Sequence, residues 1–324
     1  MKHISRMLAA GALAFGAVAV GAQPFPSKPL EFVVHTGPGG GADIFARQVA
    51  DIITKEKWLP QPIVIQNRLG GGGALALSYV AGKKADPYTV LTVVASLMLA
   101  IPVRSGQEKE LGLANYQPLA LLGFDLNCVA VPPDSPYKTV KDLVDAARAK
   151  PKGINISLGS IGGASHYLPY SIEKMANVRF NLVSMKTGAE AVTAVLGGHT
   201  HATTEQLSEM IPYIEAGKIR IIGIAATKRI QGIPNVPTLK EQGLDLHVGA
   251  GRGFWAPAGI PKEAAATMEA TFEKVYKTAA WREYLNKSLY EDIYMGSAEF
   301  GKFLAKHQPE MTQYITDLGL ANRK

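Results

Sequence analysis

The chain has 324 residues, of which 47% are hydrophobic and 19% charged, a composition typical of a folded globular protein long enough for two domains. Its net charge of +7 favours anionic ligands weakly, but no Lys/Arg cluster gives it the footprint of a nucleic-acid-binding protein. A single cysteine, Cys128, excludes an internal disulfide, so stability must come from a buried core.

The N-terminus has the features of a secretory signal peptide. Lys2 and Arg6 form a basic segment, residues 7–20 are apolar, and Val20-Gly21-Ala22 offers a small-residue cleavage site. This apolar run is too short to span a bilayer, and no cysteine lies near the cleavage site to take a lipid. We therefore expect a mature chain that begins at Gln23 and is free in an exported compartment.

From Lys28 to about Asp125 the hydrophobic pattern alternates between the periods of strands and helices. We expect a glycine turn before each helix, the second at Gly70 to Gly73. The elements expected here are strands at 30–34, 62–66 and 89–94 and helices at 43–55 and 74–82. Such alternation favours a parallel sheet covered by helices.

A second alternating unit begins with a strand at 126–131, in which Cys128 is expected to be a buried structural residue rather than a nucleophile. Its other elements are helices at 139–149, 164–176, 188–196 and 208–216 and strands at 154–158, 180–184, 200–204 and 218–225. The tail from Pro261 is expected to be helical. One face of its last helix carries the stripe Phe300, Phe303, Leu304, His307, Met311 and Ile315, on which His307 is expected to be a half-buried packing residue.

The nine residues from His35 to Asp43 join the first strand to the first helix through a glycine turn. Glycines allow a close approach to the backbone, and the first N–H groups of a helix have no partner inside it, so such a turn can hold a carboxylate or phosphate. A tight turn without a ligand is the alternative. The dinucleotide fingerprint is met only formally, because Gln66-Asn67 stands where an acidic residue should bind the ribose. A P-loop is excluded because the helix begins with Gly-Ala-Asp instead of Gly-Lys-Ser/Thr.

Three further turns also lie at the carboxyl ends of strands, where open α/β sheets bind ligands. Residues 157–166 offer hydroxyl groups suited to capping a helix or binding a carboxylate oxygen. Residues 186–189 add the cation of Lys186, and residues 94–97 close the third strand. Two domains facing each other would bring all these turns into one cleft.

Several segments, taken together and in order, resemble the Bug or TctC family of periplasmic substrate-binding proteins of tripartite tricarboxylate transporters. They are residues 35–47, 66–68 with 70–73, 186–191, 196–198, 216–220 and 252–259. The resemblance implies a type II periplasmic-binding-protein fold, with two α/β domains, two crossover strands and a central ligand cleft. It also implies that backbone N–H groups of two glycine-rich turns hold a small carboxylate, at positions matching 39–43 and 157–165 here.

On this basis we expect a signal peptide at residues 1–22, a first domain of residues 23–126 and 251–324, and a second domain of residues 127–250. The chain departs from the family pattern at His35-Thr36, Thr187, His201 and Glu205, which leaves the ligand undefined. The ligand-binding residues that we predict are Gly39, Gly40, Gly41, Ala42, Asp43, Ser96, Ser160, Gly163, Ser165, Lys186, Thr187, Gly188, Glu205 and Arg252.

Some of these residues have a second interpretation. Asp43 can cap the first helix and pair with Arg47 four residues on, and Arg252 can form a hinge or surface ion pair instead of clamping a carboxylate. His35 and His166 flank glycine turns, but nothing in the sequence completes a metal site around them. We expect no metal and no cofactor.

The leading hypothesis is a monomeric binding protein that captures a di- or tricarboxylate, or an aromatic acid, and presents it to a membrane permease. The rival is a secreted hydrolase acting on a carboxylate-bearing substrate, with Ser160 or Ser165 as nucleophile and His166 or His35 as base. It is disfavoured because no Gly-x-Ser-x-Gly elbow follows a strand. A ligand-sensing regulator of the same fold conflicts with the export signal and with the lack of a DNA-binding helix pair. No nucleic-acid partner is expected.

Overall fold

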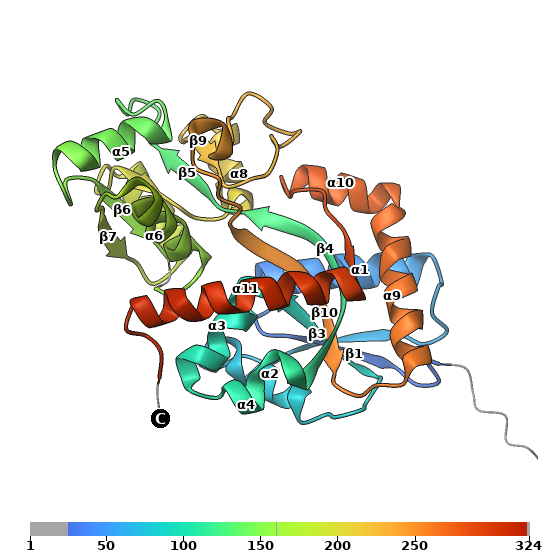
Figure 1. The fold of residues 1–324 in the computed structure, drawn as a ribbon. Coiled ribbons are helices and arrows are strands. Elements are labelled where there is room, and N and C mark those ends of the chain that lie inside the picture. Colours follow the sequence, from blue (N-terminus) through green and yellow to red (C-terminus); the bar gives the residue numbers. More distant parts are fainter. Residues whose placement is uncertain (1–24, 160, 323–324) are drawn as a thin grey trace, which may run out of the picture.

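The computed structural model describes residues 25–159 and 161–322. The expected signal peptide and Ser160 therefore lie outside the described residues. The chain forms two α/β lobes, each built on its own sheet, with β4 and β10 running from one lobe toward the other (Figure 1). Among the described helices none is long and apolar enough to cross a membrane.

The first lobe contains a six-stranded sheet in the order β11-β4-β10-β3-β1-β2. Strands β1, β2 and β3 are parallel, whereas β10 pairs antiparallel with both β3 and β4. Leu30, Phe32, Val33 and Val34 of β1 are fully buried, as expected for a strand covered on both faces. The strand bounds are β1 Leu30–Val34, β2 Ile63–Asn67, β3 Thr89–Val94, β4 Tyr116–Leu126, β10 Gly249–Pro257 and β11 Met295–Gly296.

Helices from both ends of the chain cover this sheet (Figure 1). Their bounds are α1 Gly41–Lys55, α2 Ala74–Ala81, α3 Ala95–Ser105, α4 Glu108–Leu111, α9 Lys262–Lys277, α10 Ala279–Lys287 and α11 Ser297–Asp317. The core beneath α1 and α9 is aromatic: Phe254 and Phe272 stack at 4.4 Å, and buried Trp281 donates its indole N–H to the carbonyl of Leu122 at 3.2 Å. A helix begins directly at Ala95, where the sequence indicated only the end of a strand.

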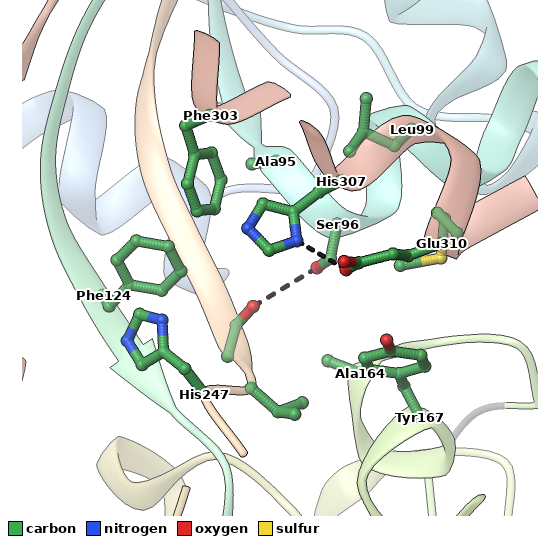
Figure 2. A pocket seen from close by; sticks show the side chains of 13 residues that line it. Ala95, Ser96, Leu99, Phe124, Ala164, Tyr167, His247, Phe303, His307 and Glu310 are labelled. Carbon is green, nitrogen blue, oxygen red and sulfur yellow. Dashed lines mark hydrogen bonds and ion pairs between the residues drawn. The ribbon is translucent and has the colours of Figure 1, made fainter. Parts of the chain in front are cut away.

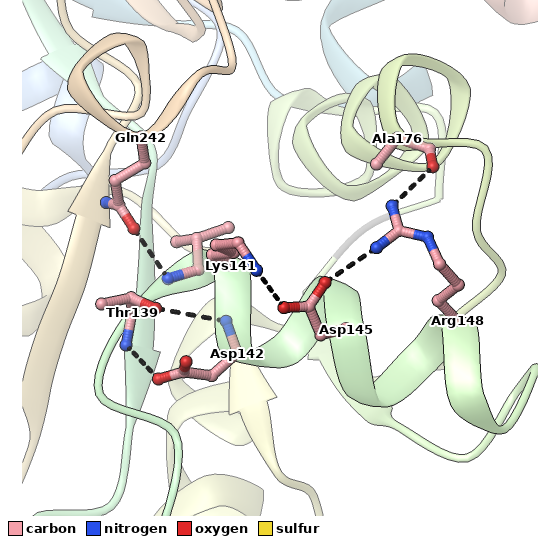
Figure 3. Close-up of polar contacts among 8 residues, drawn as sticks. Thr139, Lys141, Asp142, Asp145, Arg148, Ala176 and Gln242 are labelled. Carbon is pink, nitrogen blue, oxygen red and sulfur yellow. Dashed lines mark hydrogen bonds and ion pairs between the residues drawn. The ribbon is translucent and has the colours of Figure 1, made fainter.

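The second lobe contains a five-stranded sheet in the order β7-β6-β8-β5-β9. Strands β6, β7 and β8 are parallel, but β5 runs antiparallel to β8 and β9. The bounds are β5 Cys128–Val131, β6 Asn155–Leu158, β7 Asn181–Ser184, β8 Ala202–Thr203 and β9 Arg220–Ile224, with α5 Val140–Ala149, α6 Ala164–Ala176, α7 Gly188–Leu196 and α8 Leu207–Glu215. Figure 3 shows how α5 begins: Thr139 and Asp142 each accept the other's backbone N–H in a capping box.

The chain crosses between the lobes at two adjacent places. Asn127 separates β4 from β5, so the strand expected at 126–131 is broken at this residue. The Asn127 N–H donates to Val248 O at 2.9 Å, its carbonyl accepts from Ala225 N at 3.0 Å, and its side chain donates to Thr204 O at 2.8 Å. These bonds hold both crossings together. The domain boundaries expected from the sequence stay a prediction.

Helix α11 links the lobes a third time, since its C-terminal end reaches α6 (Figure 1). Tyr314 donates to the carbonyl of Gly163 at 3.2 Å, and Asp317 accepts hydrogen bonds from Tyr170 and Lys174. Cys128, the first residue of β5 after Asn127, is completely buried. Burial raises the pKa of its thiol, so Cys128 has the structural role that the sequence indicated.

Candidate functional site

A cavity of about 440 Å³ lies between the lobes and is lined by residues from both of them. Its walls include Gly41, Ala42, Ser96, Gly163 and Arg252 from the predicted set, so the structure brings together residues that are far apart in the sequence. The other lining residues are His35, Thr36, Val94, Leu97, Ala164, Gln206, Ser208, Glu209 and Ala250. The cavity has the size of a small-molecule site.

The turn before α1 supplies one wall, and its N–H groups divide into two sets. Gly40 donates to Gly37 O at 3.0 Å and Gly39 donates to the Asp43 carboxylate at 2.9 Å, so both groups are occupied inside the turn. The N–H groups of Gly41, Ala42 and Asp43 have no hydrogen-bond partner among the described residues. They point out of the first turn of a helix, where the helix dipole favours an anion.

Asp43 fixes the shape of this turn. Its carboxylate also bonds Arg47 at 2.8 Å and the Asn67 amide at 2.8 Å. The hydrogen bond from Arg47, with those from Asn67 and Gly39, lowers the pKa of Asp43 to about 2 even though burial acts against it. Asp43 is therefore a charged cap that shapes the turn, and it offers a ligand only its backbone N–H.

Arg252 lies beside the α1 turn, but its guanidinium already has a protein partner. Nη2 donates to the Asp125 carboxylate at 2.8 Å, and both side chains are almost completely buried. Asp125 also accepts the hydroxyl and the N–H of Ser208, at 2.8 and 3.3 Å. A Cβ placed on Gly41 would lie 2.9 Å from Arg252 Nη2, so the cation borders the open N–H groups of α1.

His35 completes this wall. Its Nδ1 is buried without a hydrogen-bond partner in the part of the chain that the structure describes. Burial, together with the charge of Arg252, lowers the pKa of His35 to about 4, so its ring is neutral at physiological pH. The wall formed by α1, Arg252 and His35 therefore presents amide dipoles and a single, partly neutralised cation.

The second lobe places acidic side chains beside the second glycine-rich turn, residues 157–165, at which the sequence analysis expected a ligand carboxylate to bind. Glu205 accepts the Gly159 N–H at 2.5 Å and is itself buried. Burial raises the pKa of Glu205, although hydrogen bonds from Gly159 and Ser165 act in the opposite direction. The Glu205 carboxylate thus occupies part of the turn where a ligand carboxylate was expected. The sequence analysis had included Glu205 only as a residue that contacts the ligand.

Glu209, in the first turn of α8, was missed by the sequence analysis. Its carboxylate lies against Gly188 at the start of α7, and Glu205 Oε2 is 3.1 Å from where a Gly188 Cβ would be. Burial, with repulsion from Glu205 and Asp125, raises the pKa of Glu209 to about 7. The spacing Glu205-x-x-x-Glu209 after a short strand was the available signal, because it places two acids at one helix start.

Several other predicted residues do not line the cavity. Thr187 caps α7 by accepting the Glu190 N–H at 3.2 Å, and Lys186 is exposed and does not line the cavity. Ser165 is buried, and its carbonyl accepts the Thr204 hydroxyl at 2.7 Å. The His166 Nδ1 accepts the Gly162 N–H at 3.2 Å, so this imidazole is engaged in shaping its own turn. The described residues contain no group of three potential metal ligands.

A narrow side pocket of about 50 Å³ adjoins the cavity and shares Ser96 and Ala164 with it. Figure 2 shows Phe124, Phe303, Tyr167 and two histidines around it. His307 bonds Glu310 at 2.8 Å, and its ring lies 4.3 Å from that of Phe303. The imidazole of His307 is half-buried against the stripe, as its spacing in the sequence indicated.

Two α/β lobes, joined by crossing strands and with a cavity between them at the ends of their strands, define a type II periplasmic binding protein. The family model described as Tripartite tricarboxylate transporter family receptor, TctC, matches residues 45–320, and the chain belongs to this family. Members of the family are periplasmic solute-binding proteins, so the chain is a binding protein and not an enzyme.

Individual relatives agree with this assignment. The chain is 31% identical over 327 residues to the UPF0065 protein in the gbd 5' region of Cupriavidus necator, with 97% of this chain and 96% of that protein covered. A ligand-free TctC solute-binding protein from Polaromonas superposes with a TM-score of 0.79 at 28% identity, covering 90% of this chain and 99% of the other. An adipate-bound protein from R. palustris has the same fold, with a TM-score of 0.77 at 23% identity and coverage of 92% and 99%.

Proposed function

We propose that the protein captures a small organic carboxylate in the cavity between its lobes and delivers it to the membrane components of a tripartite tricarboxylate transporter. The observation that carries this proposal is the open set of N–H groups at Gly41, Ala42 and Asp43, which borders Arg252. Removal of residues 1–22 as a signal peptide would place the mature chain in the periplasm. The adipate found in the R. palustris protein of the same fold supports a carboxylate ligand.

A carboxylate suits this wall for two physical reasons. Its two oxygens can accept several N–H groups at once, and bonds to an ionised acceptor are roughly twice as strong as neutral ones. The positive end of the α1 dipole and the adjacent guanidinium both favour negative charge. A sugar hydroxyl or a neutral amide would gain neither advantage.

A thermal-shift screen of mono-, di- and tricarboxylates and small aromatic acids tests this function. A ligand that binds only the native state stabilises it by RT ln(1 + [L]/Kd), about 2.7 kcal/mol at a hundredfold excess over Kd. The best acid should raise Tm by several degrees, and its uncharged amide should give little shift. Equal shifts for acid and amide, or shifts only from sugars and nucleotides, would refute the carboxylate proposal.

A di- or tricarboxylate would bind better than a monoacid only if the second lobe offered a second anion-binding site. Glu205 and Glu209 occupy the region where that second site was expected.

A further inference from the structure

Helix α11 is attached to the first lobe at both ends. At its start, the Ser297 hydroxyl donates to the carbonyl of Pro118 on β4 at 2.7 Å, and Phe300 one turn further on is completely buried. Beyond its last turn, the Asn322 N–H donates to the carbonyl of Val103 on α3 at 3.2 Å. The whole helix should therefore move with the first lobe.

Between these two attachments, one face of α11 packs against α6 of the second lobe (Figure 1). The ring of Tyr314 is almost completely buried, and its centroid lies 4.8 Å from the ring centroids of both Tyr167 and Tyr170. Its hydroxyl donates to the carbonyl of Gly163 at 3.2 Å. Packing of aromatic rings at such distances stabilises a contact beyond the area that it buries.

A charged contact lies one turn further along α11. The Asp317 carboxylate accepts hydrogen bonds from Lys174 at 2.5 Å and from the Tyr170 hydroxyl at 2.6 Å. Hydrogen bonds from Lys174, Tyr170 and Gln313 lower the pKa of Asp317 to about 2, so the carboxylate is ionised at physiological pH. Both bonds from α6 are therefore made to a charged acceptor.

These contacts also reach the wall of the cavity. Gly163, whose carbonyl accepts from Tyr314, lines the cavity itself. A Cβ placed on Gly162 would lie 3.1 Å from the side chain of Leu320, which follows α11. The turn before α6 thus rests on the end of α11. Because these contacts join side chains of the two lobes without a covalent link, a hinge motion that moves α6 away from the first lobe breaks them together.

We propose that the C-terminal end of α11 is a latch that favours the closed form of the protein by binding α6 through Tyr314 and Asp317. The latch sets the ratio of open to closed molecules without touching a ligand. It would therefore change the apparent affinity of any ligand that binds the closed form. This inference goes beyond carboxylate capture and does not depend on which ligand the cavity takes.

The test measures the distance between the lobes in the ligand-free protein by double electron–electron resonance. One spin label is placed by Lys109→Cys on α4 of the first lobe and the other by Ala149→Cys at the end of α5 of the second lobe. Both positions are exposed and lie outside the latch. Cys128 is completely buried, so the labels should react with the introduced cysteines.

A charge exchange tests the contact between Asp317 and Lys174. Asp317→Lys places like charges beside each other and should raise the ratio of open to closed molecules about fivefold or more, seen as a shift to longer distances. Adding Lys174→Glu restores opposite charges and should return the distances to those of the protein without these changes. Glu299→Lys makes the same change of charge at an exposed position in the first turn of α11, and this control should leave the distances unchanged.

Tyr314→Ala tests the aromatic contact. It removes the ring packing and the hydrogen bond to Gly163, and should raise the ratio of open to closed molecules about tenfold or more. Urea unfolding of each variant checks that the fold is retained, and the exposed charge variants keep the test decisive if Tyr314→Ala fails to fold.

The latch is wrong if the folded variants keep the distances of the parent protein. It is equally wrong if Lys174→Glu fails to reverse the shift caused by Asp317→Lys, because the contact with α6 would then not be its cause. Neither measurement uses a ligand. A failure of every acid in the thermal-shift screen would therefore overturn carboxylate capture and leave the latch standing, and the reverse also holds.

Discussion

The buried pair formed by Asp125 and Arg252 should contribute strongly to stability whenever only one partner is removed. The two side chains are 1% and 9% exposed and 2.8 Å apart, so removing either leaves a desolvated charge without its partner. We expect Asp125→Leu and Arg252→Met each to lower the free energy of unfolding by about 3–5 kcal/mol. The double variant removes both charges and should be more stable than either single one, losing about 1–3 kcal/mol because Ser208 loses its acceptor.

Urea unfolding, followed by circular dichroism and fluorescence, measures these differences as shifts of the midpoint. The exposed pair Lys287–Glu283, whose side chains are 75% and 64% exposed, is the control, and Glu283→Gln should cost less than about 1 kcal/mol. The reasoning is refuted if the single variants lose no more than this control. It is also refuted if the losses simply add in the double variant, since additivity would mean that the two charges do not interact.

Two further predictions concern the wall formed by α1, Arg252 and His35. Gly41→Val should weaken carboxylate binding about tenfold or more, because its side chain would enter the cavity and push the Arg252 guanidinium away from the α1 turn; unchanged affinity by calorimetry would contradict this. His35 has a folded-state pKa of about 4 against 6.5 in the unfolded chain, so the unfolded chain binds more protons between these values and stability falls as the pH drops through them. Wild-type protein should lose about 3 kcal/mol more than His35→Gln between pH 7 and pH 4 in urea unfolding, and equal losses would count against the assignment.

The elements that the sequence predicted well are those whose pattern is local. Helices α6 and α7 have the predicted bounds, and β1 and β3 agree residue for residue, because apolar spacing and glycine turns mark them. Strands β10 and β11 and most of β4 were missed. They are antiparallel partners brought together from residues 116–126, 249–257 and 295–296, and no local pattern carries that pairing. For the same reason the reversed direction of β5 could not be predicted.

The site shows the same division. The glycine turn before α1 was found because strand, glycine and helix signals are adjacent in the sequence. Which of its N–H groups stay open depends on the position of the Asp43 side chain, which occupies Gly39 and leaves Gly41 free. The pairing of Arg252 with Asp125 joins residues that are 127 positions apart, and only the folded chain could reveal it. Glu209 was missed because the glycine turns that it faces lie elsewhere in the sequence.

The contact through Asp125 also bears on how a ligand would close the lobes. Asp125 on β4 bonds both Arg252 on β10 and Ser208 at the start of α8, so it neutralises much of the Arg252 charge and leaves the α1 amides as the main attraction for a carboxylate. A ligand shifts an open–closed equilibrium only by its difference in affinity for the two forms. An acid that contacts the α1 wall alone binds both forms about equally. A ligand whose far end also contacts the second lobe gains that contact only when the lobes are close, and would therefore drive closure.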